Sequence, residues 1–222
     1  MGVLILLRHG QSQWNLENRF TGWTDIALTD RGRADAAKAA MTLSSYRFDR
    51  AFTSKLERAS ETLTIILDAL RQTKVPIEAD TALNERHYGD LQGLNKAETV
   101  EKFGKEQVQQ WRRSYFTRPP HGESMEDCEK RTLPYFFGKI FPPVARGETV
   151  LVAAHGNSLR PIIKHLDKLE PEAAAVLEIG LCTPYVYTFD GEKLTKKEII
   201  SVPGIVTQGA SLTEKSVKEG RV

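Results

Sequence analysis

The chain has 222 residues, enough for one large domain or two small ones, and its 40% hydrophobic and 27% charged residues are typical of a globular protein. The formal net charge of +2 argues against a general nucleic-acid-binding protein, because such proteins are strongly basic. No apolar stretch approaches the roughly 20 residues that span a bilayer, so we expect neither a nucleic-acid nor a membrane partner.

The N-terminal apolar run and the cysteines indicate the cellular compartment of the protein. Val3–Leu7 is too short for the core of a signal peptide, and Arg8 ends it. The only cysteines, Cys128 and Cys182, lack the spacing of a metal site, and such sparse use is typical of a reducing compartment. We therefore expect a cytoplasmic protein.

The first part of the chain predicts strands that alternate with helices. Val3–Leu7 is expected to be a buried strand, because such runs of Val, Ile and Leu are typical of parallel sheets. The long loop at 10–29 follows, and loops of this length in compact domains are usually functional. Beyond it we expect a helix at Asp30–Leu43 capped by Thr29, a strand at Phe48–Thr53, a helix that begins at the capping-box signature Ser54-Lys55-Leu56-Glu57, and a strand at Pro76–Ala79.

The rest of the chain continues this alternation. Expected are short helices at Lys96–Phe103 and Glu106–Arg113, a helix from a Ser124 cap to about Ile140 that Pro134 should kink, a buried strand at Thr149–Ala154, a helix from Asn157 or Ser158 to Leu166, and a strand pair at Pro184–Phe189 and Leu194–Ser201. The order predicts an α/β fold, a three-layer α/β/α sandwich around a mostly parallel sheet.

The C-terminal segment differs from the rest. Residues 202–222 are polar, hold three glycines and show no period, so we expect a mobile tail after a single catalytic domain at residues 1–201. Lys215, Lys218 and Arg221 would be attracted to an anionic ligand, which makes the tail a candidate lid over a site that must exclude water.

Two histidines follow the two most strongly predicted strands. Arg8-His9-Gly10 comes directly after Val3–Leu7, and His155-Gly156 comes directly after Thr149–Ala154. Ligands of open α/β sheets bind beyond the carboxyl ends of the strands, so neighbouring strands would bring the two imidazoles together. One imidazole can attack phosphorus while cationic groups hold the equatorial oxygens. The pair therefore indicates phosphoryl chemistry, although a lone histidine is more often a core or surface residue.

Further charged side chains are candidates for the same site. Arg58 falls in the first turn of a predicted helix, where backbone amides also favour anions, and is otherwise a solvated helix-end arginine. Glu85 is a candidate general acid–base or part of a surface patch. Lys96 with Arg112 and Arg113 would clamp carboxylate or phosphate, or form a solvated basic helix face.

Longer motifs carry a family resemblance. The chain resembles the cofactor-dependent phosphoglycerate mutases of the histidine phosphatase superfamily over about residues 3–189. The first of its motifs marks the superfamily, and the Asn84–Gly89 block with Lys96, Arg112 and Arg113 is more specific to the mutases. The motifs are Leu7-Arg8-His9-Gly10-Gln11-Ser12, Asn15, Arg19-Phe20-Thr21-Gly22-Trp23, Leu83-Asn84-Glu85-Arg86-His87-Tyr88-Gly89, Leu91-Gln92-Gly93-Leu94-Asn95-Lys96, Gln110-Trp111-Arg112-Arg113 and Ala153-Ala154-His155-Gly156-Asn157-Ser158.

The resemblance implies a role for each matching residue. His9 would be the phosphorylated nucleophile, Glu85 the proton donor and acceptor, and His155, with Arg8 and Arg58, would surround the transferred phosphoryl group. The remaining substrate-binding residues would be Ser12, Asn15, Thr21, Gly22, Tyr88, Lys96, Arg112, Arg113, Gly156 and Asn157. The implied reaction is the glycolytic and gluconeogenic interconversion of 3-phosphoglycerate and 2-phosphoglycerate through phosphohistidine, primed by 2,3-bisphosphoglycerate and without a metal.

Protonation and assembly are further expectations. His9 should be neutral to act as a nucleophile, whereas a phosphate dianion close to His155 should raise the pKa of that ring and keep it cationic. Longer family members carry an insertion of about two dozen residues where this chain has only His121-Gly122 between Pro120 and Glu123. The absence of this insertion is expected to affect the shape of the site mouth and the assembly of subunits. A homodimer is one assembly that we consider.

Three other functions fit the same residues. A phosphatase on this scaffold would let water take the phosphate from His9, and a non-catalytic sensor would bind the phospholigand without phosphorylation of His9. A metal-dependent hydrolase built from His9, Glu85 and His155 would lose activity with a chelator.

Overall fold

The computed structural model describes residues 1–205, which form one mixed α/β domain around a six-stranded sheet with the strand order β3-β2-β4-β1-β5-β6. The strands are β1 (Gly2–Arg8), β2 (Arg50–Thr53), β3 (Ile77–Ala79), β4 (Thr149–Ala154), β5 (Pro184–Asp190) and β6 (Lys193–Ile199). Strands β3, β2, β4 and β1 are parallel to one another, while β5 is antiparallel to both β1 and β6.

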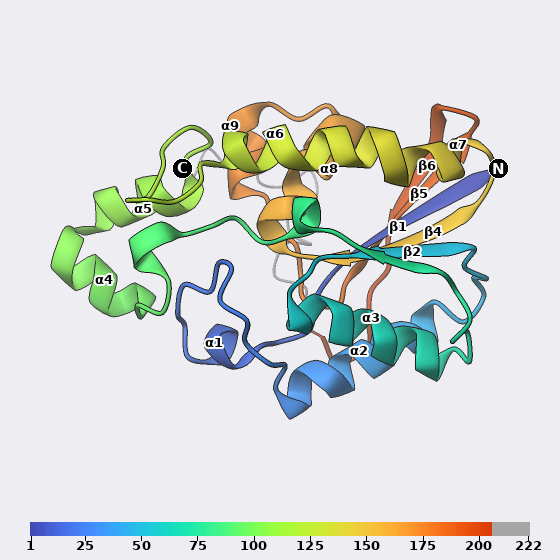
Figure 1. The fold of residues 1–222 in the computed structure, drawn as a ribbon, viewed down its shortest axis with the longest axis horizontal. Coiled ribbons are helices and arrows are strands. Elements are labelled where there is room, and N and C mark those ends of the chain that lie inside the picture. Colours follow the sequence, from blue (N-terminus) through green and yellow to red (C-terminus); the bar gives the residue numbers. More distant parts are fainter. Residues whose placement is uncertain (206–222) are drawn as a thin grey trace, which may run out of the picture.

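Helices cover both faces of this sheet. The longer ones are α2 (Asp30–Thr42), α3 (Glu57–Ala69), α6 (Met125–Tyr135) and α8 (Gly156–Asp167). Figure 1 shows α2 and α3 on one side of the strands and α6 and α8 on the other, with α1 (Gln13–Leu16), α4 (Lys96–Phe103) and α5 (Lys105–Arg113) extending past the end of the sheet. The predicted three-layer α/β/α sandwich with a mostly parallel sheet is confirmed.

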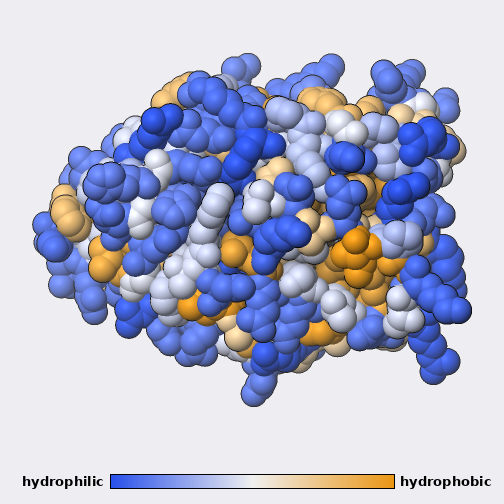
Figure 2. Space-filling view, viewed as in Figure 1, coloured by the Kyte–Doolittle hydropathy of each residue, from blue (hydrophilic) through white to orange (hydrophobic). Residues whose placement is uncertain are grey.

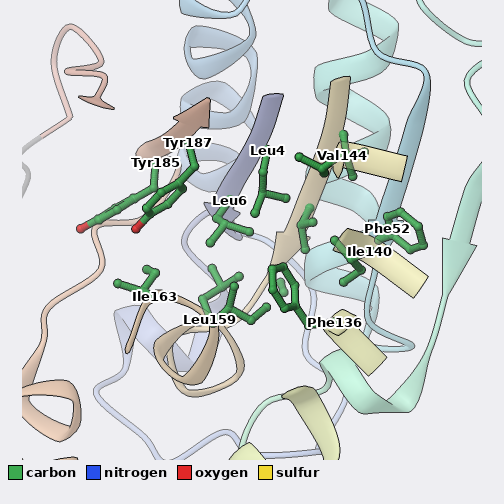
Figure 3. Packing of buried hydrophobic residues seen from close by; sticks show 14 of the residues in the cluster. Leu4, Leu6, Phe52, Phe136, Ile140, Val144, Leu159, Ile163, Tyr185 and Tyr187 are labelled. Carbon is green, nitrogen blue, oxygen red and sulfur yellow. The ribbon is translucent and has the colours of Figure 1, made fainter. Parts of the chain in front are cut away.

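The two cores follow from the alternation of side chains along β1. Leu4 and Leu6 pack on one face with Leu159 and Ile163 of α8 and with Phe136, all of them buried (Figure 3). Ile5 and Leu7 point to the other face, where they meet the alanines of α2 and the Leu and Ile residues of α3. Successive strand residues face opposite sides of a sheet, so a strand that is apolar throughout is buried on both.

The polar residues lie mainly outside these cores. The surface seen in Figure 2 is largely hydrophilic, and its hydrophobic residues form small separate patches. No helix among residues 1–205 is both long enough and apolar enough to cross a membrane.

Most predicted boundaries agree with the structure to within two residues. Thr29 caps α2 by accepting the Gly32 N–H, and Ser124 caps α6 in a capping box with Asp127. The helix predicted to run to about Ile140 ends at Tyr135, and a π-helical segment, Phe136–Ile140, separates it from α7 (Phe141–Ala145), while the kink at Pro134 stays a prediction. The remaining elements are α9 (Pro171–Val176) and the 3₁₀ turns Thr81–Leu83 and Gly89–Leu91.

The capping box predicted at Ser54 and Glu57 is wrong. Helix α3 begins at Glu57 with Leu56 as its N-cap residue, whose side chain makes no cap hydrogen bond, and the Glu57 N–H donates to Asp25 Oδ1 at 2.7 Å. Ser54 lies instead in the turn between β2 and α3, fully buried, where its hydroxyl contacts an imidazole of the candidate site. A buried hydroxyl needs a polar partner, and here a tertiary contact replaces the local cap.

The end of the described chain packs on the domain. Val202 is 3% exposed and, with the partly buried Ile205, joins the cluster on the α2 and α3 face of the sheet. The packed part of the chain therefore reaches at least to Val202, the first residue of the predicted tail. Residues 206–222, which hold the basic side chains of the predicted lid, lie outside the described residues.

Candidate active site

The sheet brings His9 and His155 together. Strands β1 and β4 are parallel neighbours in register from Val3 with Thr149 to Arg8 with Ala154, and the His9 N–H donates to the Ala154 carbonyl at 3.0 Å. The two ring centroids are 4.9 Å apart, and the side chains are almost entirely buried. The predicted meeting of the two histidines at one end of the sheet is confirmed.

The His9 ring is held in an orientation that suits a nucleophile. Its Nδ1 lies 2.7 Å from the carbonyl oxygen of Gly10, and this contact is a hydrogen bond only when Nδ1 carries a proton. In the neutral ring the proton therefore sits on Nδ1, and the lone pair sits on Nε2. Burial, together with Arg58 and Arg8, holds the pKa of His9 well below its usual value, which favours the neutral ring.

Gly10 allows the loop after His9 to lie close to α2. A Cβ atom at Gly10 would come within 2.5 Å of the Gly32 carbonyl oxygen, which no larger residue tolerates. The Gly10 N–H donates to Thr62 Oγ1 of α3 at 3.0 Å. The backbone that orients His9 is thus held by the first turn of one helix and the middle of another.

His155 lies deeper than His9 and contacts Ser54. The Oγ of Ser54 and Nε2 of His155 are 2.7 Å apart, and Nδ1 of His155 has no hydrogen-bond partner within the described residues. Burial, followed by Arg58, lowers the pKa of His155 as well. The opposite protonation states predicted for the two rings are therefore not built into the protein alone and would need a bound anion.

Ser54 was missed as a site residue. It follows β2 directly, just as His9 follows β1 and His155 follows β4, and all three strands are parallel neighbours. The strand-end rule that selected the histidines thus applied to Ser54 too. Ser54 and Glu57 also match a capping box, so the sequence predicted a helix cap at Ser54 and not a site residue.

Two arginines, the partly buried Arg8 and the buried Arg58, complete the inner part of the site. Arg8 Nη1 donates to the Ile179 carbonyl at 3.0 Å, and Arg58 donates from Nη1 to Thr24 O at 3.0 Å and from Nη2 to Gly22 O at 2.8 Å. Burial lowers the pKa of Arg58 to about 10. Both Nε groups are buried without a partner in the described chain. Unpartnered buried donors are rare, and around His9 they indicate an anion site.

A pocket of about 250 Å³ lies in front of these groups. Predicted site residues that line it are Arg8, Asn15, Thr21, Gly22, Glu85, Tyr88, Lys96, Arg112, Arg113, Gly156 and Asn157. His9, Arg58 and His155 are buried and are not among its lining residues. Ser12 is also fully buried, and its hydroxyl caps α1 by accepting the Asn15 N–H at 3.4 Å. The structure therefore places Ser12 as a support for Asn15 and not in the pocket wall.

Glu85 is fixed at the start of α8. Its Oε1 accepts the backbone N–H of Arg86 at 2.7 Å and that of Asn157 at 3.1 Å, while its own carbonyl oxygen accepts from Trp23 and Arg131. The side chain is 8% exposed and reaches the pocket. Among residues 1–205 both side-chain hydrogen bonds fall on Oε1, so Oε2 is available to exchange a proton with a ligand.

Helices α4 and α5 supply the outer cations. Lys96 is the first residue of α4, and Arg112 and Arg113 are the last two of α5. The buried Arg86 donates from Nη2 to the carbonyls of Trp111 and Arg112, at 2.9 and 3.3 Å, and so fixes the end of α5. Burial lowers the pKa of Lys96 and of Arg112, and nearby cations add to this effect. Positive charges are therefore crowded together in the pocket.

The loop at 10–29 and the segment after Leu83 form one wall. Asn157 Nδ2 donates to the Tyr88 hydroxyl at 3.3 Å, and the Arg86 guanidinium lies 4.6 Å from the centre of the Tyr88 ring. The backbone N–H of Trp23 donates to Gln92 Oε1 at 2.8 Å. These contacts tie the two segments together beside α8.

Four lining residues were not predicted as site residues: Arg19, Phe20, Arg160 and Glu178. Arg160 is one helical turn from Asn157 in α8 and donates to Asn157 Oδ1 at 2.5 Å, so helical spacing could have identified it. Burial lowers the pKa of Arg160 to about 10. Glu178 lies in the connection between α9 and β5, a segment without a periodic pattern.

The charges of the pocket indicate its ligand. Six cationic side chains line it against two carboxylates, Glu85 and Glu178. Within residues 1–205 no group of three or more His, Cys, Asp or Glu side chains is arranged to hold a metal ion. The site is therefore suited to a small ligand with several negative charges, one of which would lie beside His9.

The comparisons with known proteins agree with this geometry. Residues 4–200 match the family described as histidine phosphatase superfamily (branch 1). A Gloeobacter violaceus protein named 2,3-bisphosphoglycerate-dependent phosphoglycerate mutase 2 is 51% identical over 209 residues, covering 91% of this chain and 95% of the relative. A Nitrobacter winogradskyi protein named 2,3-bisphosphoglycerate-dependent phosphoglycerate mutase is 52% identical over 192 residues, covering 86% and 93%.

A solved structure with the same fold is a mycobacterial glucosyl-3-phosphoglycerate phosphatase in complex with VO3. It is 26% identical, has a TM-score of 0.77, and covers 90% of this chain and 98% of that one.

Proposed function

Because the chain belongs to the histidine phosphatase superfamily, branch 1, we propose that it interconverts 3-phosphoglycerate and 2-phosphoglycerate through a phosphohistidine at His9. The observation that carries this proposal is the His9 ring. Within residues 1–205 its Nε2 lone pair has no partner, and two unpartnered buried donors, Arg8 Nε and Arg58 Nε, lie in the same inner site as the unpartnered Nδ1 of His155. The relatives named as mutases at about half identity support the choice of substrate.

His9 transfers a phosphoryl group in each half of the reaction. From phosphohistidine, the N–P bond at Nε2 breaks as an O–P bond forms at the 2-hydroxyl of 3-phosphoglycerate, whose proton goes to Glu85. In the second half Nε2 attacks the phosphorus on the 3-oxygen, that O–P bond breaks, and Glu85 returns the proton. Arg8, Arg58 and His155 neutralise the phosphoryl oxygens throughout.

The charges of the pocket support 2,3-bisphosphoglycerate as the primer, which would supply the phosphoryl group that first converts His9 to phosphohistidine. That molecule carries close to five negative charges, from one carboxylate and two nearly doubly ionised phosphates. Two cation sets match it, the inner one at Arg8 and Arg58 and the outer one at Lys96, Arg112 and Arg113. A monophosphate alone would leave one set without a partner.

The second candidate function is a phosphatase, in which water takes the phosphoryl group from His9. The fold shared with the glucosyl-3-phosphoglycerate phosphatase favours it. The outer cations favour the mutase, because hydrolysis of a phosphohistidine needs only the inner site. The predicted cytoplasmic location, the homodimer and the lid remain predictions.

The deciding experiment supplies purified protein with 3-phosphoglycerate and catalytic 2,3-bisphosphoglycerate, and follows 2-phosphoglycerate and inorganic phosphate together. We expect 2-phosphoglycerate to form many times faster than phosphate, with and without a chelator. Phosphate as the dominant product would support the phosphatase, and loss of both products with the chelator would support a metal-dependent hydrolase. Tight binding without either product would leave a phospholigand sensor.

A further inference from the structure

Glu178 is a pocket carboxylate that the proposed reaction does not use. It lines the pocket with Glu85 among six cationic side chains, and it faces a site proposed to hold a highly anionic ligand. A carboxylate in this position opposes the binding of anions. Its presence therefore needs a reason beyond the phosphoryl transfer itself.

Glu178 is paired with a substrate-binding arginine. Its Oε1 accepts a hydrogen bond from Arg113 Nη2, and the side chains of Arg113 and Glu178 are 22% and 43% exposed. The proposed function places the same guanidinium against the carboxylate or outer phosphate of the ligand. An anion that binds Arg113 must therefore replace Glu178 as its partner.

The backbone around Glu178 is fixed by residues of the same site. Arg160 Nε donates to the Leu177 carbonyl at 2.8 Å, and Arg8 Nη1 donates to the Ile179 carbonyl at 3.0 Å. The hydroxyl of Tyr185 donates to the Glu178 carbonyl at 3.3 Å. Glu178 can therefore leave Arg113 by a change of side-chain rotamer, but its carboxylate stays near the pocket.

The pairing of Glu178 with Arg113 reduces the electrostatic repulsion among the outer cations. Burial lowers the pKa of Arg112, Arg113 adds to that effect, and Glu178 counteracts it. The carboxylate thus offsets repulsion among the outer cations when no ligand is bound. A ligand gains binding free energy from Arg113 only if its own contact with that guanidinium is more favourable than the contact with Glu178.

We propose that Glu178 is an internal counter-anion that determines the ligand specificity of the pocket. It pairs with Arg113 before a ligand binds, and a phosphoglycerate displaces Glu178 from Arg113. This inference rests on the proposed function, because it assigns Arg113 to the ligand. Ligands that reach Arg113, such as 3-phosphoglycerate and 2,3-bisphosphoglycerate, compete with Glu178. Inorganic phosphate, which needs only the inner site at Arg8 and Arg58, does not.

The test compares ligand affinities in a background that cannot be phosphorylated. Calorimetric titrations of His9→Ala and His9→Ala/Glu178→Gln use 2,3-bisphosphoglycerate, 3-phosphoglycerate and inorganic phosphate. We expect Glu178→Gln to tighten binding of the first two by about two- to fivefold, the range for a partly exposed ion pair, and to leave phosphate unchanged. Glu192→Gln, an equal loss of charge in the exposed turn between β5 and β6, should change none of the three.

Arg113→Met separates competition from long-range repulsion. In that variant Glu178 has no guanidinium to occupy, so adding Glu178→Gln should no longer tighten binding. A gain that persists without Arg113, or affinity that is unchanged or weaker in Glu178→Gln, would overturn the proposal while leaving the mutase reaction intact. If His9→Ala itself did not bind 2,3-bisphosphoglycerate, the proposed function would fail, and this inference with it.

Discussion

At the scale of single residues, the buried histidines show how one environment can serve phosphoryl transfer. Burial and the neighbouring arginines lower the pKa of both His9 and His155. The neutral state suits His9 as a nucleophile, and a phosphoryl dianion beside His155 would supply the charge that its cation needs. The positive charge of the site therefore resides in Lys96 and the arginines and not in the histidines.

These lowered pKa values predict how stability depends on pH. A histidine whose pKa is lower in the folded than in the unfolded chain binds its proton preferentially when unfolded, so stability is lost as pH falls below about 6.5. We expect the unfolding free energy of the wild type to drop between pH 7.5 and pH 5, and His155→Gln to drop less steeply. Urea denaturation at several pH values measures both slopes, and equal slopes would show that His155 does not contribute.

Glu85 gives a second residue-scale prediction. Its Oε1 accepts two backbone hydrogen bonds, so Glu85→Gln loses the proton carrier but can keep much of this geometry with its amide oxygen. The mutase rate should fall by about 10²- to 10⁴-fold, the usual contribution of general acid–base catalysis. Binding of 3-phosphoglycerate should change little when titrated separately. A rate within a few-fold of the wild type would remove Glu85 from the proton transfer.

At the scale of elements, the sequence predicted regular segments well and tertiary contacts poorly. The continuous apolar runs of β1 and β4 and the helical spacing of α3 are strong patterns, and the caps Thr29 and Ser124 act through neighbours three residues away. Ser54 has the same local pattern, yet its hydroxyl contacts His155, 101 positions along the chain. Glu178 likewise reaches the pocket from the connection between α9 and β5, which no local pattern encodes.

Helix α5 presents two cations in its last turn, which predicts the effect of Arg113→Met. A charge-assisted hydrogen bond is worth about 1.5–3 kcal/mol, so affinity for 3-phosphoglycerate should fall by roughly 10- to 100-fold. Inorganic phosphate should lose much less affinity, because it binds at the inner site. Competition titrations against both ligands measure these affinities. Equal losses of affinity would mean that Arg113 acts on the fold or on the overall electrostatic potential of the site.

Helix α2 depends on its cap next to the His9 loop. The Thr29 hydroxyl accepts the Gly32 N–H at 3.0 Å and donates toward Gln11, so Thr29→Ala should cost about 1 kcal/mol of unfolding free energy. Ser60→Ala is the matched control, because its hydroxyl only donates within α3 and caps no helix. Urea denaturation of the two variants should separate them, and identical losses would argue against the capping role.

At the scale of the whole molecule, the sheet creates the site by its strand order. Parallel strands β2, β4 and β1 end at the same edge and deliver Ser54, His155 and His9 to one place. Helices α4 and α5 extend beyond that edge and bring the outer cations over it (Figure 1). An inner cation set beside His9 and an outer set on α4 and α5 support the proposed mutase reaction, because hydrolysis of a phosphohistidine would need only the inner set.

The most direct test of this account follows a labelled phosphoryl group. Protein incubated with ³²P-labelled 2,3-bisphosphoglycerate should acquire an acid-labile label on Nε2 of His9, assignable by ³¹P NMR, and unlabelled 3-phosphoglycerate should remove that label into bisphosphoglycerate and 2-phosphoglycerate. His9→Ala should acquire none. A label that persists in His9→Ala would place the nucleophile elsewhere, and label released mainly as inorganic phosphate in the presence of 3-phosphoglycerate would contradict the mutase reaction.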